Sequence, residues 1–99
     1  NGPDTGVVNN KFSIIGTWKK ESNSSTTYYT FDNVNQCTKE KLYTEDPANN
    51  YTKVYKYTFN QSTNILTLYE NQQIKEQEKV IIYNANQISF DDDIYYRVR

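Results

Sequence analysis

Apolar and polar residues alternate with a period of two along most of this 99-residue chain. Near the middle, Tyr55, Tyr57 and Phe59 share one face of the pattern, while Val54 and Lys56 share the other. This alternation is typical of strands that bury one face and expose the other. Eight stretches show it, at residues 15–21, 26–32, 36–44, 51–60, 65–70, 74–83, 87–91 and 94–99.

Asn and Asp, rather than Gly, separate these stretches. Both residues tolerate a left-handed backbone and bond to their own neighbouring backbone, as tight turns require. Strands that recur every 8 to 12 residues or so are typical of β-sandwiches and β-barrels, not of units in which strands alternate with helices. The pattern therefore predicts an all-β fold, a small antiparallel up-and-down barrel of about eight short strands. A β-sandwich is the alternative fold, because alternation alone does not encode the order of the strands or the closure of the sheet.

Residues 1–10 differ from the rest of the chain, because they show no alternation and hold two of the three glycines. We interpret them as a flexible N-terminal tether, with an ordered strand extension as the alternative. Residues 11–99 are then one barrel domain, in which 11–15 are expected to form a short helical turn that closes one end. The first residue is Asn1 and not Met, so we expect that an export signal has been removed.

Composition limits both the interior and the chemistry. Aromatic residues make up 15% of the chain and ten of them are Tyr, which predicts an interior mostly filled by aromatic rings. The chain has no His, so it lacks His-based catalytic triads and His metal ligands. Its one cysteine, Cys37, cannot form an internal disulfide. We therefore expect no enzymatic activity, no cofactor and no metal site.

The charge and hydropathy of the chain exclude two classes of partner. A net charge of −1 provides no broad electrostatic attraction for nucleic acid. No apolar run approaches the roughly 20 residues of a membrane-spanning helix. We expect no nucleic-acid partner and no membrane span.

Several motifs carry a resemblance to a known family. Gly16-Thr17-Trp18 opens the first stretch and resembles the Gly-x-Trp signature of lipocalins. The motifs that follow in order have the sequences YTF (29–31), YTF (57–59), NILTL (64–68) and YYRVR (95–99). Over about residues 12–99, the chain resembles the compact lipocalin-like domains of secreted or lipid-anchored bacterial proteins.

The resemblance implies a structural contact and a location. In lipocalins an Arg of the last strand packs over the Trp of the first, and Arg97 and Arg99 are the candidates to cover Trp18 beside Gly16. A cation over an indole ring contributes ~0.5–2 kcal/mol. The family also implies export to the cell envelope, periplasmic or at the surface, with lipid anchoring through a segment outside this sequence. The chain is shorter than ligand-carrying lipocalins, which argues against a roomy carrier.

The expected function is non-enzymatic binding of a small ligand or of a partner protein. Trp18, Tyr29, Tyr55 and Tyr57 are the candidate ligand-binding residues, because aromatic rings around an open cavity would hold a small hydrophobic, aromatic or sugar ligand.

Two alternatives remain open. One is a structural module that contacts protein or carbohydrate through an outer tyrosine-rich face, with Tyr28 and Tyr95 exposed. The other is an inhibitor of a secreted enzyme, presented through an Asn-rich loop.

The charged clusters are interpreted as surface features. Residues 91–93, three consecutive Asp, lack the spacing and the Gly of an EF-hand loop and predict a polar hairpin turn. Glu70, Glu76 and Glu78 stand near Lys75 and Lys79, which favours a solvated or guarded strand edge over the carboxylate pair of a glycosidase.

Overall fold

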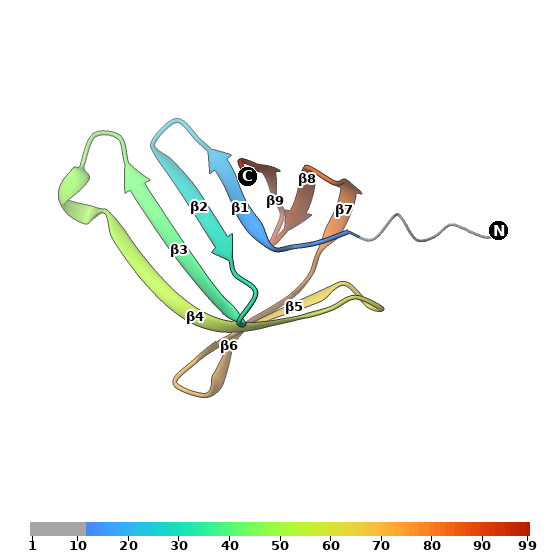
Figure 1. Ribbon diagram of the computed structural model, residues 1–99. Coiled ribbons are helices and arrows are strands. Elements are labelled where there is room, and N and C mark those ends of the chain that lie inside the picture. Colours follow the sequence, from blue (N-terminus) through green and yellow to red (C-terminus); the bar gives the residue numbers. More distant parts are fainter. Residues whose placement is uncertain (1–11) are drawn as a thin grey trace.

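Nine antiparallel strands form one curved sheet in the computed structural model, which describes residues 12–99 (Figure 1). The interpretation of residues 1–10 as a tether lies outside the described residues. The strands are β1 (Gly16–Glu21), β2 (Ser25–Phe31), β3 (Gln36–Tyr43), β4 (Tyr51–Asn60), β5 (Ile65–Glu70), β6 (Gln73–Lys79), β7 (Ile81–Asn84), β8 (Gln87–Phe90) and β9 (Asp93–Arg97), with one 3-10 turn, η2 (Pro47–Asn49), before β4.

The strands follow an up-and-down order around a nearly closed barrel. Within β1 to β6 and within β7 to β9, each strand pairs with the next along the chain, and β9 returns to pair with β1. The sheet order is β6-β5-β4-β3-β2-β1-β9-β8-β7. The predicted all-β, antiparallel, up-and-down barrel is confirmed. The helical turn expected at the start of the domain is wrong over residues 12–15, which lead into β1 without regular secondary structure.

The barrel closes through one bent stretch of chain, which the sequence pattern treats as a single strand at 74–83. Before Val80 this stretch is β6 and pairs with β5; after Val80 it is β7 and pairs with β8. Val80 is completely buried, and its N–H donates to the carbonyl of Asn64 (2.8 Å). One long strand thus pairs on one side in its first half and on the other side in its second half, as the stagger of a barrel requires. The nine strands therefore correspond to the predicted eight.

Aromatic rings pack against one another in the interior. Phe90 stacks on Tyr95 at 4.6 Å between ring centroids, and Tyr29 meets both rings edge-on at 5.3 and 5.4 Å. Phe31 and Tyr57 make a further edge contact at 4.9 Å. Each such ring removes roughly 150–250 Å² from water, so aromatic packing is the main stabilising element of this core. The buried core consists of Ile14, Trp18, Tyr29, Phe31, Cys37, Tyr55, Tyr57, Leu66, Leu68, Val80, Ile88, Phe90 and Tyr95.

Arg97 covers the indole of Trp18 at one end of the barrel. Its guanidinium carbon lies 4.3 Å from the centroid of the indole. The same group donates hydrogen bonds to the carbonyls of Ile15 (2.7 Å), Ser13 (2.6 Å) and Ala85 (3.0 Å). Of the two arginines named from the sequence, Arg97 therefore makes the contact with Trp18, and it also ties the start of β1 to the β7–β8 turn.

Gly16 is required by this arrangement. Its φ is +138°, a conformation that side-chain-bearing residues rarely adopt. A Cβ atom at this position would clash with the carbonyl oxygen of Arg99 and with the guanidinium of Arg97. Arg99 contributes through its backbone, because its carbonyl accepts a hydrogen bond from the N–H of Thr17 (3.0 Å).

The two faces of β9 are the reverse of what their apolar content suggests. The alternative of an outer tyrosine-rich face placed Tyr95 on the outside, but it is 4% exposed, whereas Tyr96 is 56% exposed. Successive strand residues point to opposite faces, so the inward position of Arg97 turns Tyr95 inward as well. Ile94 and Val98, the apolar residues of the other face, are left on the outside.

Candidate functional site

A cleft of about 660 Å³ opens where β1 and β9 part. The two strands pair only from Trp18 opposite Arg97 to Lys19 opposite Tyr96. Beyond that point β1 continues to follow β2 and β9 continues to follow β8, so the strands separate. The cleft is lined by Lys19, Lys20, Glu21, Ser22, Asp92, Asp93, Ile94 and Tyr96.

Backbone groups at the cleft are left without a strand partner. The N–H of Arg97 donates toward β8, and that of Val98 donates to the carbonyl of Thr17 on the β1 side (2.7 Å). Backbone groups of an antiparallel strand alternate between its two neighbours. The N–H and C=O of Ile94, and those of Glu21 across from it, therefore point into the cleft, where the strand pairing of the described residues has ended.

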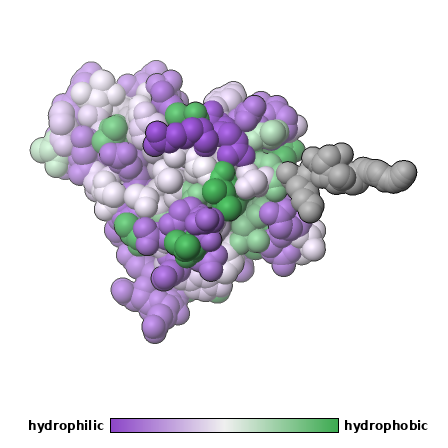
Figure 2. Space-filling view, viewed as in Figure 1, coloured by the Kyte–Doolittle hydropathy of each residue, from purple (hydrophilic) through white to green (hydrophobic). Residues whose placement is uncertain are grey.

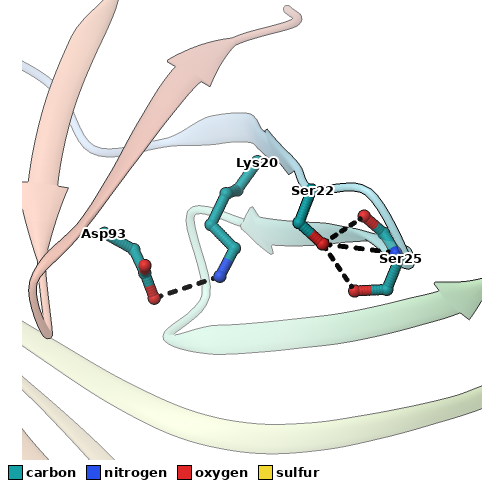
Figure 3. Close-up of polar contacts among 4 residues, drawn as sticks. All are labelled: Lys20, Ser22, Ser25 and Asp93. Atoms are coloured by element: carbon teal, nitrogen blue, oxygen red, sulfur yellow. Dashed lines mark hydrogen bonds and ion pairs between the residues drawn. The ribbon is translucent and has the colours of Figure 1, made fainter.

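Two ion pairs lie in the cleft. Lys20 reaches across from β1 to Asp93 at the start of β9, with its Nζ 3.1 Å from the carboxylate (Figure 3). On β1 itself, the Nζ of Lys19 lies 3.2 Å from Glu21. The hydrogen bond and the charge of Glu21 raise the pKa of Lys19, so this amine stays protonated at neutral pH. The cleft thus presents fixed ammonium and carboxylate groups side by side.

Ser22 forms the end of the cleft and is tied into the β1–β2 turn. Its N–H donates to the carbonyl of Ser25 (2.8 Å), and its hydroxyl donates to the same carbonyl (3.2 Å; Figure 3). The N–H of Ser25 in turn donates to the Ser22 hydroxyl (3.3 Å). These contacts hold the turn in one conformation and therefore fix the wall of the cleft.

Apolar groups form the rim of the cleft on the β9 side. Tyr96 is 56% exposed and Ile94 is 42% exposed. Across the strand pair, Tyr96 lies opposite Lys19. An exposed phenol ring next to charged hydrogen-bonding groups can stack on the apolar face of a sugar ring while those groups bind its hydroxyls.

The four candidate ligand-binding residues predicted from the sequence lie in the core. Trp18, Tyr29, Tyr55 and Tyr57 are each less than a tenth exposed. Tyr57 donates from its hydroxyl to the carbonyl of Asp32 (2.6 Å), and burial raises the pKa of Tyr29. A cavity of about 270 Å³ touches Tyr55 and a separate one of about 160 Å³ touches Tyr57. The structure therefore places these four rings in the packed interior of the barrel. No one cavity brings Tyr55 and Tyr57 together, because each touches a different one.

Three carboxylates meet at the unpaired side of β6. Oxygen atoms of Glu76, Glu78 and Asp91 lie within 4.8 Å of one another. In register, Glu76 and Glu78 lie opposite the buried residues Leu68 and Leu66, so they point inward and are half-buried. Of the two alternatives stated from the sequence, the guarded edge therefore fits, because β6 ends the sheet, whereas a solvated position does not fit these two half-buried residues. Burial, and secondarily the charge of Asp91, raise the pKa of Glu76. Asp91 and Asp92 form the predicted turn between β8 and β9, and Asp93 is already the first residue of β9.

The cleft was not predicted from the sequence, although one signal pointed to it. The first and last strands of an up-and-down barrel are neighbours, so the charges of residues 19–21 and 92–93 could have been expected to face each other. Where the two strands stop pairing depends on the curvature of the sheet, and alternation does not encode that point.

Comparisons of this chain with protein-family models, with curated proteins and with solved structures gave no match. None of the helical segments in residues 12–99 has the length and apolar character needed to cross a membrane.

Proposed function

We propose that this chain is a non-enzymatic binding module of lipocalin-like architecture that binds a carbohydrate in the cleft between β1 and β9. The observation that carries the proposal is the exposed ring of Tyr96 at the rim of a 660 Å³ cleft, beside paired charges of both signs. Sugars offer an apolar face for stacking and several hydroxyls that donate and accept, and the cleft matches both features.

Two features support the lipocalin-like part of the proposal. Gly16-Thr17-Trp18 lies on the first strand, and Arg97 of the last strand covers Trp18. The same resemblance motivates export to the bacterial cell envelope. A full-length precursor that carries no export signal would contradict that location without affecting the binding site.

Binding without catalysis fits the state of the cleft's polar groups. The amines of Lys19 and Lys20 are each paired with a carboxylate, and the hydroxyl of Ser22 is held by the turn. A protonated amine is neither a general base nor a nucleophile. The groups in the cleft are thus suited to hydrogen bonding, and no cofactor is part of the proposal.

The position of the aromatic residues favours the cleft over the interior. A hydrophobic ligand inside the barrel would have to displace rings that already contact one another at 4.6 to 5.4 Å. Displacement would expose buried apolar area at a cost of about 25 cal/mol per Å². The cleft needs no such rearrangement.

The test compares two tyrosines of similar exposure. Tyr96→Ala removes the ring at the cleft, while Tyr83→Ala removes a ring that is 52% exposed and does not line it. Neutral oligosaccharides selected on an immobilised glycan panel would be titrated against ¹⁵N-labelled protein. We expect Tyr96→Ala to weaken binding about three- to tenfold, as the loss of one stacking contact predicts, and Tyr83→Ala to leave it unchanged.

Three results would count against the proposal. One is the absence of any glycan binding up to millimolar concentration. Another is an equal loss of affinity in Tyr83→Ala. The third is a set of chemical-shift changes centred on Tyr55 and Tyr57 rather than on residues 19–22 and 92–96, which would return the site to the interior.

A further inference from the structure

The outer face of the β7–β8–β9 segment is apolar. Its exposed residues are 42% to 56% accessible to solvent. In register, Ile81 lies opposite Ser89, which lies opposite Ile94, so these residues form one row across the three strands. In Figure 2, apolar surface (green) is visible on the side where Figure 1 shows β7 and β8. We call this surface the outer patch; it consists of Ile81, Tyr83, Ile94, Tyr96 and Val98.

The outer patch adjoins a strand edge that carries no charge. The sheet ends at β6 on one side and at β7 on the other. β6 (QIKEQEK) holds four charged residues, which discourage pairing with another strand, and the β5–β6 hairpin at the bottom of Figure 2 is polar (purple). β7 (IIYN) has neither a charge nor a proline. Of the two edges, β7 is therefore the one suited to pair with another chain.

The alternation of backbone groups shows which residue of β7 can form hydrogen bonds with another strand. Ser89 faces β7, because its neighbours in β8 face β9. Ile81, opposite Ser89, then directs its backbone groups toward β8, and Ile82 directs its own away from the sheet. The N–H of Val80, two residues earlier, confirms this direction by bonding away from β8, to Asn64. Within the described residues, the N–H and C=O of Ile82 have no strand partner.

We infer that β7 pairs antiparallel with β7 of a second copy of this chain, about a two-fold axis at Ile82. The two Ile82 residues then exchange both of their backbone hydrogen bonds. This register keeps the outer patches of both copies on one face and places Ile81 opposite Tyr83 of the second copy, twice. A β-branched residue opposite an aromatic one is a favourable cross-strand pair.

The lack of charge on β7 favours a second copy as the partner, and the small area of contact sets its strength. The outer patch contains no charged side chain to recognise an acidic or basic partner, and β7 is its own uncharged complement. Because the two outer patches lie side by side on one face, edge pairing covers mainly Ile81, Ile82 and Tyr83 of each copy. A stable interface buries roughly 800 Å² per partner, so the dimer should be weak and should form at about micromolar to millimolar concentrations.

Sedimentation velocity over a concentration series tests the inference. The expected result is a rise in weight-average mass toward that of a dimer. Ile81→Lys should abolish the rise, because it replaces the pair of Ile81 and Tyr83 with a charge on the pairing edge, and lysine on an edge strand discourages strand pairing. Ile74→Lys is the matched control: Ile74 is 59% exposed on β6 and lies outside the outer patch. A monomer at every concentration, or a dimer that Ile74→Lys disrupts and Ile81→Lys does not, would overturn the inference.

A cross-linking experiment tests the register. The variants Ile81→Cys and Tyr83→Cys should form a disulfide with each other when mixed, because opposite residues bring their Cα atoms within the 4.4–6.8 Å that a disulfide needs. Each variant alone should cross-link poorly, because its two identical cysteines would lie diagonally across the strand pair and not directly opposite each other. Cys37 does not interfere, since it is completely buried. Efficient cross-linking of either variant alone would contradict the two-fold axis at Ile82, as would the absence of a mixed disulfide.

Discussion

At the scale of single residues, Arg97 connects three segments that are distant in sequence. Its planar guanidinium stacks on Trp18 and donates to three carbonyls, two before β1 and one in the β7–β8 turn. An ammonium group has no plane to stack and bonds as a single point. The fixed fork of the arginine, rather than its charge, therefore accounts for its role.

Replacing Arg97 should destabilise the fold, and a lysine at this position, which keeps the positive charge, should not restore the stability. We expect Arg97→Ala to lower the free energy of unfolding by about 2–3 kcal/mol, and Arg97→Lys to lose most of the same amount. Urea denaturation measures the change. Arg99→Ala is the control and should stay within about 0.5 kcal/mol, because Arg99 acts through its carbonyl. A full recovery in Arg97→Lys would show that charge alone matters.

Cys37 is the other residue whose behaviour follows from its position. It is completely buried, and burial raises the pKa of its thiol to about 12. Only the thiolate reacts with disulfide reagents, so we expect native protein at pH 8 to react with Ellman's reagent at least about a hundredfold more slowly than unfolded protein. The reaction in urea provides the reference. Equal rates in the native and unfolded states would mean that this face of β3 opens readily.

At the scale of elements, the side of β6 without a strand partner among the described residues carries an unfavourable cluster of charges. There Glu76 and Glu78 face Asp91 of the β8–β9 turn. Three carboxylates within 4.8 Å repel one another at neutral pH. Lys39 offsets part of this repulsion, since its charge lowers the pKa that burial and Asp91 raise at Glu76.

This arrangement predicts how stability depends on pH. The pKa of Glu76 is raised in the folded state above its ordinary value of 4.5. The folded protein therefore binds the proton more tightly, and the stabilisation is complete below 4.5 and is lost as the pH rises through the folded pKa. We expect Glu76→Gln to be more stable than the parent at pH 7 and to flatten this dependence in urea titrations between about pH 4 and 7. Glu40→Gln, an exposed change on β3, should have little effect. A destabilised Glu76→Gln would show that the charged form is needed.

At the scale of the whole molecule, the packed interior moves the candidate sites to the places where the sheet is incomplete. The β1–β9 cleft lies where two paired strands part, and the outer patch adjoins the unpaired edge of β7. A small barrel has little interior volume, and aromatic side chains occupy it here. Binding at edges and clefts, as we propose, would leave the packed core intact, so binding and stability would depend on different residues.

The sequence by itself determined the class of the fold, its antiparallel order and the filling of the interior by aromatic rings. Alternation with a period of two requires one buried and one exposed face, and Asn- and Asp-rich turns mark where each strand ends. The resemblance to lipocalins singled out Gly16 and Trp18, and it left Arg97 and Arg99 as the candidates to cover the indole. The alternation and the turns follow from local geometry, in which each residue constrains only its neighbours.

Only the tertiary structure decided which face of each strand is buried and where the sheet opens. On β9 the local pattern offered Ile94, Tyr96 and Val98 as the apolar face, but the contact between Arg97 and Trp18 turned Tyr95 inward instead. The bend at Val80 and the cleft between β1 and β9 both arise from closing a curved sheet on itself. Closure couples strands that are distant in the chain, and no local pattern of residues records it.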